Sequence, residues 1–174
     1  MPHAVTHVLV AIILADIVRD YIAKDKKQVP LYLVLVAGIA GLLPDIDIIF
    51  YWFLRLVSSI ELSEVHRTFS HTLFVPAIFL AIGFATYKIK RITKYKISIR
   101  DIAFFIALGV SVHLFLDFLL AGWIRPFYPF TTYSIGLNVI PTELSRTVIP
   151  GIDAILLVAW LVHEYKNHRI KDFI

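Results

Sequence analysis

The sequence predicts an all-α membrane protein: a polytopic transmembrane helix bundle of about five spans, folded as a single integral-membrane domain over residues 1–174. Three observations predict this class. Hydrophobic residues make up 59% of the chain and charged residues only 17%, against roughly 45–50% and about 25% in soluble domains. The hydrophobic residues lie in long runs. Clusters of Lys and Arg flank those runs.

The five expected spans follow one another along the chain. They cover approximately residues 4–23, 29–54, 70–87, 101–121 and 151–165. No Lys or Arg precedes the first hydrophobic run, which is not the pattern of a cleaved signal peptide, so we expect this run to remain as a span. Residues 122–150 are rich in glycine, proline and aromatic side chains and predict a loop with an interfacial or re-entrant piece.

The positions of Lys and Arg predict the orientation. If the five spans alternate in direction, two loops and the C-terminal tail place 12 of these residues on one side, and the opposite side carries 4. The richer side is cytoplasmic under the positive-inside rule. We therefore expect a multi-pass protein of the cell (plasma or inner) membrane, with its N-terminus outside and its C-terminus in the cytoplasm. Basic residues that flank spans also argue against a nucleic-acid partner, despite the net charge of +4.

Four hydrophobic segments carry histidine or aspartate at the end away from their basic cluster. His7 precedes Lys24 by about 17 residues, and His71 precedes Lys88 by the same number. At about 1.5 Å of rise per residue, these groups lie roughly 20–30 Å from the basic ends, so alternating helices bring them to one depth near the outer face. The chain has no cysteine, so imidazole and carboxylate must bind any metal there. The candidate ligands are His7, Asp45, Asp47, His66, His71, His113 and Asp117.

The aspartate pair lies in the run Leu-Leu-Pro-Asp-Ile-Asp, residues 42–47, which interrupts the second span. On a helix Asp45 and Asp47 would point about 200° apart. Pro44 breaks the local backbone hydrogen bonding, and an unwound backbone lets both carboxylates face one cation. The alternative is a helix end at the interface with solvated aspartates. His7, taken alone, is more often an interfacial residue than a ligand.

Two further motifs supply histidines. His66 and His71 stand five residues apart across an expected helix start. They are typical of a metal site, and the alternative is a polar loop with an interfacial histidine. His113 and Asp117 share one helix face at spacing i, i+4. Three interpretations fit this position: both side chains bind one metal, Asp117 orients the imidazole of His113, or the pair forms a hydrogen bond that ties two spans together.

Together these motifs resemble the YdjM-like family of membrane-bound metal-dependent hydrolases. The matching pieces are Thr6-His7, Leu42-Leu43-Pro44-Asp45-Ile46-Asp47, His66-Arg67-Thr68-Phe69-Ser70-His71-Thr72, His113-Leu114-Phe115-Leu116-Asp117 and the stretch from Gly122 to Phe130, all within roughly residues 1–135. Thr68, Ser70 and Thr72 stand where the family pattern usually has glycine, threonine and serine, so hydroxyls are kept and a glycine is lost. A weaker similarity to zinc-dependent phospholipase C and related nucleases implies two or three zinc ions and a phosphoester substrate.

We therefore expect a membrane-embedded metal-dependent hydrolase that acts at the outer face on a phosphoester of a lipid or lipid-linked substrate. The expected metal is zinc, with manganese as the alternative, and two ions are expected because seven candidate ligands exceed one tetrahedral site. Asp47, His66 and Arg67 are the candidate catalytic residues, and Arg67 and Arg125 are the candidate phosphate-binding residues. Membrane lipid is the expected partner, and nothing in the sequence indicates a homo-oligomer.

Two rival functions remain open at this point. Intramembrane histidine and aspartate also build ion paths, so the chain could be a metal or proton transporter or another metal-handling protein. A transport path requires polar groups through the full depth, but the inner halves of the second to fourth spans are almost wholly apolar, and only Asp16 lies deep in the first. This pattern favours a one-sided site. The third possibility is a structural or regulatory membrane protein in which the cluster ties helices together.

Overall fold

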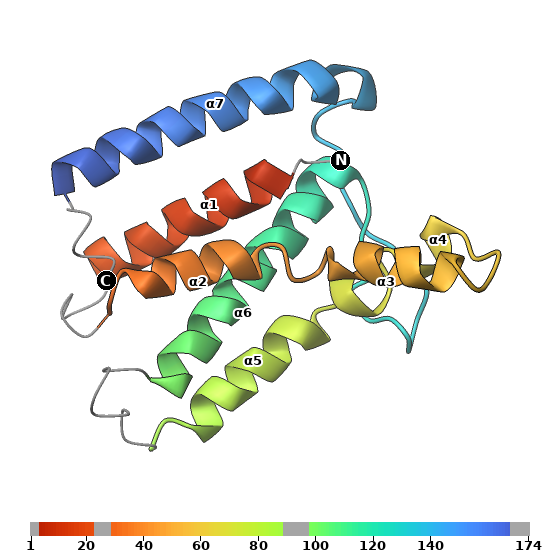
Figure 1. The fold of residues 1–174 in the computed structure, drawn as a ribbon, viewed down its shortest axis with the longest axis horizontal. Coiled ribbons are helices and arrows are strands. Elements are labelled where there is room, and N and C mark those ends of the chain that lie inside the picture. The colour runs from red at the N-terminus through yellow and green to blue at the C-terminus, as the bar shows by residue number, and fades with distance from the viewer. Residues whose placement is uncertain (1–3, 23–28, 89–97, 168–174) are drawn as a thin grey trace.

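The computed structural model describes residues 4–22, 29–88 and 98–167, and this part of the chain is all-α, as predicted (Figure 1). Its helices are α1 Ala4–Ile17, α2 Tyr32–Ala40, α3 Ile46–Arg55, α4 Leu62–Val65, α5 Phe74–Ala85, α6 Ile99–Leu116 and α7 Thr142–Asn167. Short π-helical turns extend α1 over Val18–Ile22 and α6 over Asp117–Ala121, and a 3-10 turn covers Phe69–His71.

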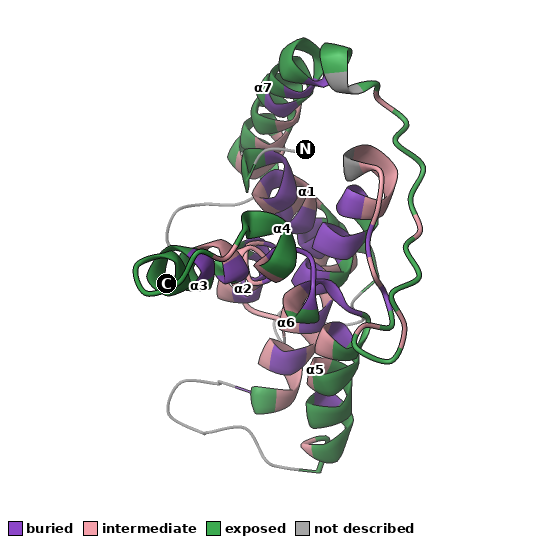
Figure 2. Ribbon diagram, turned by 90° about the vertical axis from the view of Figure 1, so that its right-hand side faces the viewer, coloured by how far each residue is buried: buried purple, intermediate pink, exposed green. Residues whose placement is uncertain are grey.

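The core lies where α1, α2 and α6 pack together. Small residues let these helices approach closely. Gly109 of α6 lies so near α2 that an added Cβ would be 2.2 Å from the carbonyl oxygen of Ala37. Ala15 and Ala37 are fully buried at the same interfaces, and Figure 2 shows the buried residues gathered in these helices. Close approach through small residues is typical of helices that pack within a membrane.

α5 and α7 cover this core from two sides, with α5 packed on α6 and α7 running alongside α1 (Figure 1). Their outer faces are apolar. Ile155 and Val158 of α7 are 70% and 60% exposed, and Phe84 of α5 is 68% exposed. Soluble monomers rarely expose large contiguous apolar patches. These faces therefore suit contact with lipid.

The second predicted span is divided into two short helices. Backbone hydrogen bonds of i to i+3 type run through residues 41–48, where the chain turns between α2 and α3. Pro44 lacks a backbone N–H and cannot continue the α-helical pattern. α2 has 9 residues and α3 has 10, so each is about 15 Å long, half the thickness of a bilayer core.

The prediction of five spans is consequently not supported. Two of the described helices are long and apolar enough to cross a membrane, Ile99–Leu120 and Glu143–Asn167. The third predicted span is shorter than expected because its helix, α5, begins at Phe74 and has 12 residues. The first hydrophobic run forms α1, with 14 residues, and a π-helical turn.

The last predicted span also has a different start. The helix begins at Thr142 rather than near residue 151, and it runs through Pro150. In a sequence, a proline usually indicates a helix boundary. At an exposed position it removes one backbone hydrogen bond, and the helix can continue past it. The predicted loop with a re-entrant piece therefore shrinks to residues 122–141, which contain one isolated antiparallel bridge between Ile124 and Ile135.

The orientation prediction rests mainly on residues outside the described part of the chain. Most of the Lys and Arg in the first loop, the third loop and the tail fall at residues 23–28, 89–97 and 168–174. The placement of the N-terminus outside and the C-terminus in the cytoplasm therefore stays a prediction.

Candidate metal centre

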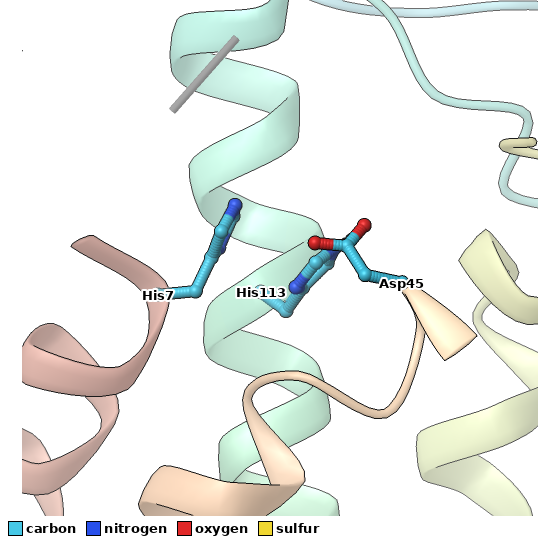
Figure 3. Close-up of side chains that lie close together, drawn as sticks. All are labelled: His7, Asp45 and His113. Carbon is cyan, nitrogen blue, oxygen red and sulfur yellow. The ribbon is translucent and has the colours of Figure 1, made fainter. Parts of the chain in front are cut away.

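Four parts of the chain meet at the candidate site: the start of α1, the turn into α3, the segment 66–71 and the C-terminal end of α6. Figure 3 shows His7, Asp45 and His113, which come from three of these parts and point toward one another. The structure brings all seven predicted ligand residues into this one cluster. Six of them are buried, and Asp45 is the one whose side chain is 27% exposed.

Three overlapping groups in the cluster have the geometry to hold a cation. They are His7–Asp45–His113, Asp45–His66–His71 and His71–His113–Asp117, and in each group one potential ligand atom per residue lies within 4.8 Å of the others. Asp45 belongs to the first two groups. A carboxylate has two oxygens and can bridge two ions, so the arrangement fits a two-metal site.

Two imidazoles approach each other closely in the cluster. Nε2 of His71 lies 3.1 Å from Nε2 of His113. Both nitrogens are near the same carboxylate oxygens: Oδ1 of Asp45 at 3.5 and 3.6 Å, and Oδ2 of Asp117 at 3.5 and 3.8 Å. Two ring nitrogens between two carboxylates form a mixed nitrogen and oxygen donor set without sulfur, which suits zinc or manganese.

A backbone contact fixes the orientation of one ligand. Nδ1 of His113 lies 2.7 Å from the carbonyl oxygen of Gly41. Because a carbonyl oxygen only accepts, Nδ1 carries the proton and Nε2 presents its lone pair to the site. The tight packing of Gly109 against α2 brings His113 and Gly41 together, since an added Cβ at Gly109 would be 3.0 Å from the Gly41 nitrogen.

Asp47, predicted as a ligand and catalytic residue, contacts two of the imidazoles in the cluster. Its Oδ1 accepts from Nδ1 of His66 at 2.9 Å. Its Oδ2 accepts from the hydroxyl of Ser70 at 2.7 Å and the backbone N–H of Arg67 at 3.2 Å, and it lies 3.2 Å from Nδ1 of His71. Both oxygens are thus engaged, and none of the three groups contains Asp47. These contacts suit a carboxylate that orients imidazoles, as carboxylates commonly do around metal sites.

Two imidazole nitrogens in the cluster are buried without a hydrogen-bond partner among the described residues: Nε2 of His66 and Nδ1 of His7. An unsatisfied buried polar atom normally costs free energy. The His7 ring also stacks on the His113 ring, with centroids 3.9 Å apart. Unpartnered buried nitrogens beside converging carboxylates match the donor set of a divalent metal site, so the residues fit such a metal.

Both predicted phosphate-binding arginines lie at one edge of the site. Arg67 is 4% exposed, and its Nε lies 3.3 Å from Oδ2 of Asp117. The guanidinium groups of Arg67 and Arg125 lie 5.3 and 5.2 Å from the ring centroid of Trp123. Arg67 is paired with the buried carboxylate of Asp117. Arg125 is partly exposed and is better placed to bind an anion from outside.

The segment 122–130 is held against the site by several contacts. The Tyr128 ring packs on Phe69 and the Phe130 ring on Phe74, with centroids 4.8 and 5.6 Å apart. The N–H of Leu73 donates to the carbonyl oxygen of Pro126 at 3.0 Å. This loop therefore covers one side of the site, while Phe130, 83% exposed, presents an apolar ring outward.

The sequence did not indicate every residue that shapes the site. The sequence predicts no site role for Ser70, yet its hydroxyl contacts both Asp47 and His71. Its position directly before a histidine was the available signal. The backbone role of Gly41 and the ring of Trp123 between two arginines had no signal in the sequence. Glu143 is exposed at the start of α7 and belongs to none of the candidate metal groups among the described residues.

Comparison with known proteins places the chain beside an inner membrane protein family. A family model described as YdjM inner membrane protein matches residues 1–170. The match extends well beyond residue 135, where the recognisable motifs of the sequence end. No curated protein and no solved structure matches the chain.

Proposed function

The chain belongs to the YdjM inner membrane protein family, and from this premise and the geometry of its His–Asp cluster we propose that it is a membrane-embedded, metal-dependent hydrolase. Its proposed substrate is a phosphoester of a lipid or lipid-linked molecule. The observation that carries the proposal is the shared Asp45, which belongs to two adjacent groups of potential metal ligands. Paired metal sites of this kind are common in enzymes that cleave phosphoesters.

The proposed cofactor is zinc, with manganese as the alternative, and two ions per chain. His7, Asp45 and His113 would hold one ion, and Asp45, His66 and His71 the other. When bound, the metal would supply Lewis acidity toward a phosphoryl oxygen and toward the attacking water. Asp117 lies within 4 Å of His7, His71 and His113 and would complete either set.

The protein's own side chains would then position the substrate and hold protons. Arg125 would bind a phosphate oxygen, and Trp123 would keep its guanidinium near the site. Arg67 would balance the charge of Asp117, to which it is paired. Asp47 would hold the proton on Nδ1 of His66 and so keep Nε2 of that imidazole available to the metal or to a proton from water.

An apolar pocket beside the cluster supports a lipid substrate. Its volume is about 610 Å³, and it reaches Asp47 and Ser70 at the site. Most of its other lining residues are apolar, and they include Leu43, Ile46, Phe50, Leu54, Val75 and Phe79. A pocket with apolar walls beside the cluster suits an acyl or prenyl chain of the proposed substrate. On the predicted topology, this site faces the outer leaflet.

The experiment is hydrolysis of phospholipids and polyprenyl phosphates by the purified protein in zinc-supplemented mixed micelles, with product detected by mass spectrometry. The wild type is compared with Asp45→Asn and His113→Ala, and Glu143→Gln serves as a carboxylate-to-amide control on an exposed residue. We expect Asp45→Asn and His113→Ala to lower the rate by at least 100-fold and the control to leave it unchanged. Equal rates in all variants on every hydrolysed substrate would overturn the proposal.

Metal transport is a second candidate function, because a further polar cluster occurs at the other end of α1, at Asp16. The buried residues of α1 between the two ends include Leu9, Ala11 and Ile12, and the last two pack on apolar residues of α2 and α6. Such a dry layer opposes a continuous ion path. Zinc flux into proteoliposomes, measured with a trapped fluorescent chelator, distinguishes the functions: transport requires flux, and the hydrolase proposal expects none.

A further inference from the structure

A second group of potential metal ligands lies between α1 and α7, away from the site described above. Asp16, His163 and Glu164 each offer one ligand atom, and these atoms lie within 4.8 Å of one another. Asp16 follows His7 by nine residues on the same helix, so the two positions are about 13 Å apart along its axis. None of these three residues belongs to the first cluster. Figure 1 shows α7 alongside α1, and the two helices are in contact.

Asp16 is the member that most needs a partner. It is 3% exposed, and its Oδ2 accepts from the indole N–H of Trp160 at 2.9 Å. Its Oδ1 is buried and has no hydrogen-bond partner among the described residues. A buried carboxylate oxygen without a partner is costly, because desolvation is not offset by any contact. A cation at this oxygen would remove that cost.

The unpartnered oxygen belongs to a residue that lines a pocket. The pocket has a volume of about 320 Å³ and lies between the two helices, with Ile13, Ile17 and Tyr21 on one side and Ala159, Trp160 and His163 on the other. A water molecule takes about 30 Å³ of liquid volume, so this space can hold an ion with several waters beside Asp16.

His163, the histidine of the group, is oriented toward α1. Its Nδ1 lies 3.1 Å from the side-chain amide of Asn167, and its Nε2 lies 3.4 Å from Oδ2 of Asp20. Nε2 therefore faces the carboxylates of α1. Nη1 of Arg19 contacts the other oxygen of Asp20 at 2.5 Å, so this second carboxylate is already paired with a positively charged side chain.

We propose that Asp16, His163 and Glu164 form a second divalent-cation site, at the opposite end of α1 from the first. Two carboxylates and one imidazole without sulfur form a donor set that suits zinc, manganese or cobalt. Asp16 comes from α1 and its two partners from α7, so an ion would join the outer helix to the core. The proposal does not depend on hydrolase activity at the first site.

The test is the zinc content of the full-length protein, purified without a histidine tag, stripped with chelator and dialysed to equilibrium against zinc before elemental mass spectrometry. Asp16→Asn/Glu164→Gln removes both carboxylates of the proposed site and keeps an oxygen that can accept from Trp160. His71→Ala/His113→Ala disrupts every ligand group of the first site. Glu143→Gln is the control, an exposed carboxylate at the other end of α7.

We expect Asp16→Asn/Glu164→Gln to bind one zinc fewer than the control, and His71→Ala/His113→Ala to retain that one ion. An equal zinc content in Asp16→Asn/Glu164→Gln and the control would overturn the second site. A single change at a half-buried residue also tests the proposal. Glu164→Gln, introduced into the His71→Ala/His113→Ala protein, is expected to weaken the affinity of that protein for cobalt at least tenfold, measured by visible absorption. Unchanged cobalt binding would overturn it as well. If His71→Ala/His113→Ala binds as much zinc as the control while Asp16→Asn/Glu164→Gln binds one ion fewer, the first site fails and the second stands.

Discussion

Oδ1 of Asp47 accepts a hydrogen bond from Nδ1 of His66 at 2.9 Å, although the two residues come from different segments 19 positions apart. The same carboxylate also contacts Nδ1 of His71 at 3.2 Å through its other oxygen. One aspartate thus contacts the Nδ1 atoms of two imidazoles. We propose that Asp47 positions these two rings and that Asp45 is the aspartate of the pair that binds metal.

Asp47→Asn is expected to lower zinc affinity about 10- to 100-fold without abolishing binding, because loss of a carboxylate behind a metal-binding imidazole typically has this effect. The measurement is competition with a chromophoric chelator. Asp45→Asn, which changes a proposed bridging ligand, should reduce zinc binding further and lower the number of ions bound. If Asp47→Asn lost as many ions as Asp45→Asn, Asp47 would be a ligand after all.

Gly109→Ala is expected to destabilise the protein by about 1–3 kcal/mol, because the new methyl group would overlap the carbonyl oxygen of Ala37. It should also weaken zinc binding, since separation of α2 from α6 pulls Gly41 from His113. Gly151→Ala is the matched control, with nothing within 4 Å of an added Cβ in an exposed helix. It should stabilise by roughly 0.5–1 kcal/mol. Denaturant unfolding in detergent checks both, and a stable Gly109→Ala variant would contradict the packing account.

Arg67→Ala is expected to cost about 3–5 kcal/mol in metal-free protein, because it leaves Asp117 buried without its paired cation. Arg125→Ala removes a partly exposed side chain that lies over the Trp123 ring, so its stability cost should be about 0.5–1 kcal/mol. Thermal unfolding of both variants provides the comparison. Equal losses would show that the Arg67–Asp117 pair does not stabilise the fold.

Removal of metal is expected to lower the thermal stability of the wild type. Free zinc at about 100 times its dissociation constant should restore roughly 2.7 kcal/mol per independent site. His71→Ala/His113→Ala should lose most of this zinc-dependent stabilisation, since both residues belong to the ligand groups. A chelator-insensitive unfolding temperature in the wild type would indicate that no metal binds the folded state.

The sequence predicted which polar residues come together better than it predicted the helices that carry them. The spacing of His113 and Asp117, and the proline before Asp45, were sufficient because they are local features. Spacing could not separate Asp45 from Asp47, because their roles depend on which of them meets His66 across the fold. The group at Asp16 was missed as a site for the same reason, since it forms only when α7 packs on α1. The five spans failed as a prediction because hydropathy does not show the turn that divides residues 29–54.

The most direct test of the central claim is the difference in zinc content between wild-type protein and His71→Ala/His113→Ala, both purified without a histidine tag and measured by elemental mass spectrometry. The account predicts that the variant binds two ions fewer per chain, while Asp45→Asn, a milder change at a partly exposed ligand, loses at least one. Equal zinc content in all three proteins would contradict it, and the His–Asp cluster would then be a polar contact that holds four segments of the chain together.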